Sequence, residues 1–91
     1  MKFEPLNSFS GEKVNGPTLC IPDIFEDSRG IFYESWNESV WNEFLKSKNI
    51  KYKKFVQDNH SLTKGLAIRG LHFQTKPFQQ GKLVMCLKGE I

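Results

Sequence analysis

The sequence is poor in the residues that build metal centres, disulfide frameworks and membrane spans. Its 91 residues include two cysteines, Cys20 and Cys86, and two histidines, with no C-x-x-C or H-x-H arrangement. Two isolated cysteines in a chain without a secretory signal are expected to be reduced, half-buried apolar residues. No apolar run approaches the roughly 20 residues of a membrane span, and the N-terminus has no signal-peptide pattern. We therefore expect a cytoplasmic protein with no membrane partner.

The chain also lacks a strong charge of one sign. It has 13 basic and 10 acidic residues, and apart from Lys51, Lys53 and Lys54 the charges are spread along the chain. A nucleic-acid-binding protein usually has a denser basic stripe, so we expect no nucleic-acid partner. A chain of this length allows one domain, residues 1–91, which would bury only about 60–65% of its unfolded surface.

The run Ile-Arg-Gly-Leu-His-Phe-Gln at 68–74 combines a cation, an imidazole and an amide in one β-prone segment. Such groups are costly to place together unless a polar ligand meets them, which favours a binding or catalytic site. In the alternative interpretation, Arg69 and His72 are simply solvated on an ordinary strand. Residues three apart face opposite sides of a regular strand, but a bulge at Gly70 would let both face one cavity.

The N-terminal third predicts short elements separated by turns. Residues 7–17 are rich in Ser, Gly, Asn and Pro and predict a loop, and residues 18–24 predict a strand interrupted by Pro22. A turn over 26–30 leads into a strand over 31–34, whose alternation places Phe32 and Glu34 on one face. Taken alone, Phe32 is more typical of a core aromatic than of a stacking partner for a ligand, whereas Glu34 favours a polar cavity.

One amphipathic helix is predicted near 36–48. Ser35 and Glu38 have the spacing of a capping box, and Asn49 is a plausible stop. Two tryptophans, Trp36 and Trp41, share its apolar stripe. They could form a platform for a sugar, or they could pack the helix against a sheet.

Three more strands are predicted, over 54–62, 66–74 and 82–91, with a turn over 61–65 and a loop over 75–81. In the first of these strands Gln57, Asn59 and Ser61 share a face, which is typical either of hydrogen bonding to a ligand or of a plain exposed surface. Short strands with one helix indicate an antiparallel β protein, a sandwich or a barrel.

Four ordered blocks carry a resemblance to a known family. They are Asp-Ser-Arg-Gly-Ile-Phe-Tyr-Glu-Ser at 27–35, Phe-Val-Gln-Asp-Asn-His-Ser at 55–61, Arg-Gly-Leu-His-Phe-Gln at 69–74 and Gly-Lys-Leu-Val at 81–84. Together they resemble the dTDP-4-dehydrorhamnose 3,5-epimerase family of sugar-nucleotide enzymes. The resemblance implies a mainly β, antiparallel, cupin-like jelly roll. Family members continue about as long again, so this chain would hold an incomplete, truncated form of that domain.

The resemblance also implies a reaction and assigns residues to it. The reaction is epimerisation at C3 and C5 of a nucleotide-linked 4-keto-6-deoxy sugar, with no metal and no cofactor. His72 matches the base and Lys82 the cation that stabilises the oxyanion. The remaining matches are substrate-binding positions: Arg29, Phe32, Glu34, Gln57, Asn59 and Arg69.

The family's tyrosine acid and the carboxylate that orients its histidine match no position of this chain. We therefore expect weak activity or none, and a sugar-nucleotide binding module without turnover is the main alternative. A metal-dependent cupin is a third reading. The sequence stops at Ile91 with no turn signal, as if cut within a strand. We expect a homodimer that covers this edge, with strand exchange as one way to do so.

Overall fold

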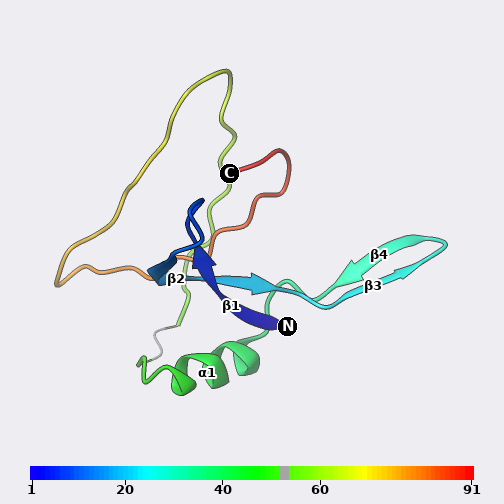
Figure 1. The fold of residues 1–91 in the computed structure, drawn as a ribbon, viewed down its shortest axis with the longest axis horizontal. Helices are drawn as coiled ribbons and strands as arrows, with labels where there is room; N and C mark the ends of the chain where they lie inside the picture. Colours follow the sequence, from blue (N-terminus) through cyan, green and yellow to red (C-terminus); the bar gives the residue numbers. More distant parts are fainter. Residues whose placement is uncertain (52–53) are drawn as a thin grey trace. The chain divides into compact units, whose positions relative to one another are not determined.

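The computed structural model describes residues 1–51 and 54–91 (Figure 1). Tyr52 and Lys53, the second of which belongs to the small basic cluster, lie outside the described residues. The chain separates into two compact units, one on each side of this point in the sequence. Among the described residues, all four strands and the helix belong to the first unit. The regular structure is therefore mainly antiparallel β with one short helix, as predicted.

The first sheet pairs β1 (Lys2–Asn7) with β2 (Lys13–Ile21) in antiparallel fashion, with a register shift between Pro5 and Asn7. This pairing corrects the loop predicted over 7–17, because residues 13–17 belong to β2 and only 8–12 connect the strands. Composition alone did not reveal β1, since Pro5 argues against a strand. β2 ends at Ile21, directly before Pro22, so the strand predicted over 18–24 is confirmed only in its first part.

The second sheet is the hairpin of β3 (Ile24–Asp27) and β4 (Gly30–Tyr33), joined by a two-residue loop. The turn predicted over 26–30 is confirmed, and the strand predicted over 31–34 ends one residue early. Neither loop residue has a positive φ, whereas Gly30 has a φ of 131°, which residues with a Cβ rarely adopt. Gly30 thus lets an ordinary residue, Arg29, occupy the loop.

Helix α1 (Glu38–Ser47) begins two residues later than predicted, and its N-cap is Asn37. The Asn37 side-chain oxygen accepts hydrogen bonds from the N–H groups of Ser39 at 3.0 Å and Val40 at 3.4 Å. The capping box predicted from Ser35 is therefore wrong. Asparagine caps a helix as well as serine does, and Asn37 directly precedes the first turn.

The predicted stop at Asn49 is confirmed. Asn49 has a φ of 55°, in the left-handed region that often ends helices. Its N–H donates to the carbonyl of Lys46 at 3.0 Å, and the N–H of Ile50 donates to the carbonyl of Leu45 at 2.9 Å. These two bonds form a Schellman motif and satisfy the last carbonyls of the helix.

An aromatic cluster joins α1 to β1. Trp41 is 8% exposed and is the one buried apolar side chain among the described residues. The ring of Phe3 in β1 lies 5.4 Å from Trp41 and 4.0 Å from Phe44, and Trp36 stacks on Trp41 at 5.5 Å. Trp41 thus packs the helix against a strand, one of the two interpretations above, whereas Trp36 precedes α1, is 39% exposed and stacks on Trp41.

The second unit contains no helix or strand within residues 54–91. The strands predicted over 54–62, 66–74 and 82–91 are therefore not formed. The predicted loop over 75–81 is present, with the Phe78 N–H donating to the carbonyl of Thr75 at 2.9 Å, and Gly65 has the positive φ of a turn. Alternation of side chains defines the two faces of a segment but not its partner, and a strand exists only when it is paired.

Cys20 and Cys86 are both free thiols. Cys20 is half-buried, as predicted, and burial raises the pKa of its thiol. Cys86 is exposed, so its predicted half-burial is wrong, because the segment that carries it is unpaired. Among the described residues, no helix has both the length and the apolar character that crossing a membrane requires.

Candidate functional site

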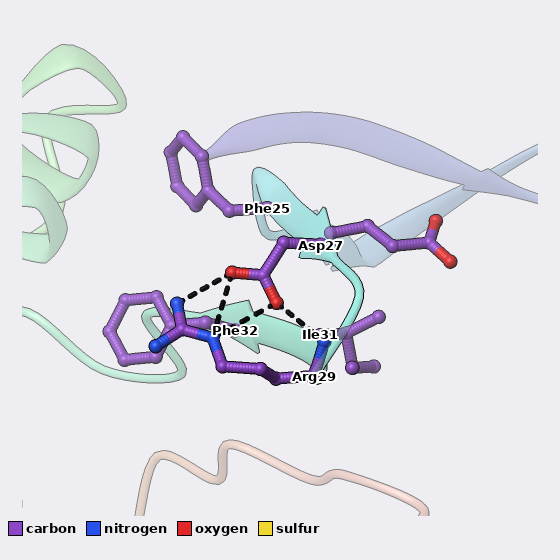
Figure 2. A pocket seen from close by; sticks show the side chains of 7 residues that line it. Phe25, Asp27, Arg29, Ile31 and Phe32 are labelled. Atoms are coloured by element: carbon purple, nitrogen blue, oxygen red, sulfur yellow. Dashed lines mark hydrogen bonds and ion pairs between the residues drawn. The ribbon is translucent and has the colours of Figure 1, made fainter.

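The β3–β4 hairpin lines a hollow of about 540 Å³ with residues 25–27 and 29–32 (Figure 2). Phe25 and Phe32 are directly opposite each other in the strand register, so their rings belong to one face of the hairpin. They are 65% and 72% exposed. Exposed rings beside a guanidinium suit a ligand that has both a flat apolar part and an anion.

Arg29, a predicted substrate-binding residue, is held by Asp27 across the turn. The Asp27 carboxylate accepts from the Arg29 backbone N–H at 2.8 Å, from Nε at 3.2 Å to each oxygen, and from Nη2 at 2.6 Å. Figure 2 shows these bonds joining the two side chains along one edge of the guanidinium. Asp27 therefore already occupies one edge of the Arg29 guanidinium, the edge formed by Nε and Nη2.

The same bonds keep both groups charged. Hydrogen bonding from the Arg29 side chain and then from its backbone lowers the pKa of Asp27, and hydrogen bonding to Asp27 raises the pKa of Arg29. The prediction from sequence did not single out Asp27. The sequence does contain a pattern that indicates this role of Asp27. An aspartate two residues before an arginine in a turn can reach both the backbone and the side chain of that arginine.

A second hollow of about 290 Å³ adjoins the first and shares Phe25 and Phe32 with it. Glu34 lines it, and its carboxylate accepts from Nδ2 of Asn37 at 3.1 Å. The same Asn37 caps α1, so the start of the helix positions Glu34. On another wall, Asp23 pairs with the α-ammonium group of Met1, and this hydrogen bond lowers the pKa of Asp23.

Three of the eight predicted site residues thus gather in the first unit: Arg29, Phe32 and Glu34. Phe32 lines both hollows, and the two polar residues lie one in each hollow. Phe32 is 72% exposed and is not part of a core in the described residues.

The other five belong to the second unit, where Gln57 and Asn59 meet. The Gln57 amide donates to the side-chain oxygen of Asn59 at 3.1 Å, as expected for residues two apart on one face. Their neighbours Asp58 and His60 approach each other to 3.6 Å, with both side chains exposed. Side chains two residues apart therefore meet in this unpaired segment.

Arg69 and His72 are exposed and are not joined to each other by any hydrogen bond in the described part of the chain. Nη2 of Arg69 donates to the backbone carbonyl of Leu62 at 3.1 Å. The bulge predicted at Gly70 is not formed, because a bulge requires a paired strand. His72 has no hydrogen-bond partner within residues 1–51 and 54–91, so nothing there selects its tautomer.

Lys82 is also exposed, and its ammonium group lies 3.5 Å from the side-chain oxygen of Gln80, at the long limit of a hydrogen bond. Its three donors are therefore almost entirely available to a ligand. For metal ions, no group of three His, Cys, Asp or Glu side chains is close enough to bind one within the two described ranges.

Comparison with known proteins identifies relatives that share most of this chain. A relative from Shigella flexneri named dTDP-4-dehydrorhamnose 3,5-epimerase is 47% identical over 81 residues, which are 87% of this chain and 42% of the relative. A relative of the same name from Methanothermobacter thermautotrophicus is 40% identical over 84 residues, 91% of this chain and 42% of the relative. No solved structure matches the chain.

The chain spans about two fifths of the length of these two relatives. The sequence pattern of the family described as dTDP-4-dehydrorhamnose 3,5-epimerase matches residues 12–91, a stretch that contains the eight predicted site residues. The resemblance drawn from four short blocks is therefore confirmed over most of the sequence. The chain belongs to the dTDP-4-dehydrorhamnose 3,5-epimerase family.

Proposed function

We propose that this chain is the substrate-binding and proton-removing part of an enzyme that epimerises C3 and C5 of a nucleotide-linked 4-keto-6-deoxy sugar in dTDP-rhamnose biosynthesis. The observation that carries the proposal is the family match over residues 12–91. The relatives' name states the reaction, and the hairpin hollow has the donors and rings that a sugar nucleotide needs.

The chemistry requires a base and a cation. Protons next to a ketone are weakly acidic, so a base removes one while a positive charge stabilises the enolate oxygen at C4. We assign the base to His72, which matches the family's base, since the free nitrogen of a neutral imidazole can accept a proton. We assign the cation to Lys82, whose ammonium group makes only a 3.5 Å contact to Gln80 and can donate hydrogen bonds to a ligand.

The binding end of the site uses the hairpin. Arg29 takes a phosphate of the nucleotide, and Phe32 packs beside the ligand's apolar surface in the 540 Å³ hollow. Glu34 accepts hydrogen bonds from hydroxyl or amide groups. Gln57, Asn59 and Arg69 match further substrate-binding positions of the family. The proposal needs no metal and no cofactor.

We further propose a single cupin-like jelly-roll domain over residues 1–91 that acts as a homodimer. Large apolar side chains in the second unit are strongly exposed, among them Leu66 at 101%, Ile68 at 95% and Leu71 at 100%. Antiparallel pairing with further strands would cover them, and strand exchange with a second copy would supply such strands.

A binding module without turnover is the second candidate for this chain. One observation favours it: the hollow beside Arg29 is formed, whereas His72 has no partner in the described ranges that would orient its imidazole. The chain also has no residue that matches the family's tyrosine acid, and general acid catalysis contributes about 10²–10⁴-fold.

Incubation of the 4-keto sugar nucleotide with the 91-residue chain in heavy water tests the proposal. We expect weak binding and slow deuterium incorporation next to the keto group. NMR measures this incorporation at C3 and C5. Binding without any incorporation would leave the binding module as the function. Absence of binding would contradict both candidates, and rapid exchange at both carbons would mean that the chain contains an acid not assigned above.

A further inference from the structure

The turn of the β3–β4 hairpin contains an ion pair, Asp27 with Arg29, in which one carboxylate makes several hydrogen bonds to a single arginine. Asp27 uses both carboxylate oxygens on Arg29, with contacts of 2.6 to 3.2 Å to the backbone N–H, Nε and Nη2. The two side chains are 51% and 88% exposed. Exposed ion pairs contribute little to stability, so we looked for a role of this pair in ligand binding.

The contacts divide the guanidinium into two edges. A guanidinium has five N–H donors in one plane, and Asp27 occupies the edge formed by Nε and Nη2. The other edge consists of Nη1 and the second hydrogen of Nη2. Within the described residues Nη1 makes no hydrogen bond. This edge presents two parallel N–H groups, the arrangement that grips two oxygens of one phosphate.

We propose that Asp27 is a positioning residue that holds Arg29 with its Nη1/Nη2 edge presented to the phosphates of the nucleotide. The inference rests on the proposed function, in which Arg29 binds those phosphates. A free arginine side chain samples many rotamers, and ordering it on binding costs affinity. Asp27 orders it in advance, because the carboxylate grips the backbone and the side chain of the same residue.

Positioning and simple electrostatics predict opposite results, which makes the idea testable. The negative charge of Asp27 repels an anion, so its removal alone should strengthen binding of a diphosphate. If Asp27 instead positions Arg29, its removal should weaken binding although the site becomes more positive. Glu26 offers a matched control, because it lines the same hollow and carries the same charge, and none of the hydrogen bonds to Arg29 comes from it.

The experiment measures the affinity of the 91-residue chain for thymidine diphosphate at fixed ionic strength, for the wild type, Asp27→Asn, Glu26→Gln and Arg29→Ala. We expect Glu26→Gln to bind equally or more tightly. Asp27→Asn should bind on the order of fivefold more weakly. This factor corresponds to the net contribution of about one hydrogen bond, which is lost when Arg29 is no longer held in its binding orientation. The Arg29 Nε–H resonance should be protected from exchange in the wild type and not in Asp27→Asn.

A double variant separates the possible failures. In the Arg29→Ala background, Asp27→Asn should cause no further weakening, because Asp27 acts through Arg29. Tighter binding by Asp27→Asn, together with weaker binding by Arg29→Ala, would overturn the positioning role and leave the proposed function intact. Unchanged binding by Arg29→Ala would remove Arg29 from the phosphate site, and the inference with it. Equal weakening by Asp27→Asn in both backgrounds would mean a general effect on the hairpin.

Discussion

The ring of Phe3 stacks on the ring of Phe44 with 4.0 Å between centroids and 10° between planes. Phe3 also meets the indole of Trp41 edge-on at 5.4 Å. These contacts join the second residue of β1 to two successive turns of α1. They are the main apolar packing of the first unit, since Trp41 is the one buried apolar side chain in the described ranges.

Phe3→Ala should therefore destabilise the first unit. We expect a loss of about 2 kcal/mol in the free energy of unfolding, less than the roughly 3–5 kcal/mol of a fully buried Phe→Ala change, because Phe3 is half-buried. Urea unfolding followed by tryptophan fluorescence measures it. Phe9→Ala is the control, since Phe9 is fully exposed, and equal effects of the two substitutions would contradict the role of the cluster.

The pair of Asp27 and Arg29 should persist at neutral pH and break only in acid. Hydrogen bonds from Arg29 lower the pKa of Asp27 below its usual value of about 3.9. A group whose pKa is lowered by folding contributes stability above its unfolded pKa, and this contribution is lost as the pH falls through the folded pKa. The carboxyl carbon signal of Asp27 should therefore titrate below the usual aspartate pKa of about 3.9. In Arg29→Ala its midpoint should rise, and an unchanged midpoint would contradict the pairing.

His72→Ala should abolish solvent exchange of the C3 proton in a version of the protein extended to the length of its relatives. The imidazole is the proposed base, so removing it leaves no group to take the proton, while nucleotide binding through Arg29 is retained. NMR in heavy water measures the exchange. His60→Ala is the control and should keep exchanging. The opposite pattern would transfer the role of base to His60.

Lys82→Ala should slow the same exchange in the extended protein. Loss of one donor to a developing oxyanion typically costs about 10²–10³-fold in rate. The comparison is with Lys88→Ala, which removes an equal charge from the same segment and should have little effect. If the two substitutions behave alike, Lys82 is a surface lysine and the enolate is stabilised by another group.

The 91-residue chain should not be a monomer in solution. Leu83, Met85 and Leu87 are 39%, 46% and 70% exposed, and covering such side chains stabilises a protein by about 1.5–3 kcal/mol each. Light scattering at micromolar concentration should give at least twice the mass of 10.6 kDa. A monomer mass together with a cooperative thermal transition would contradict this prediction.

Local patterns were predicted correctly where a few neighbouring residues decide the structure. The turn over 26–30, the strand that follows it and the helix stop at Asn49 all depend on bonds within about five residues. The helix itself was predicted from its apolar stripe, because apolar residues at three- and four-residue spacings indicate one face of a helix. The error at its start is small and local, because Asn37 and Ser35 are both good N-caps and pattern alone does not choose between them.

The sequence by itself determined the family, the single helix, the hairpin turn and the residue types available for catalysis. Tertiary structure decided which backbone segments pair, as in β1 with residues 13–17 of β2, and which side chains meet, as in Phe3 with Phe44 and Asp27 with Arg29. It also left the segments around His72 and Lys82 without strand pairing in the described ranges. The physical reason is that a helix satisfies its hydrogen bonds within one segment, whereas a strand depends on a partner that its own alternation does not specify.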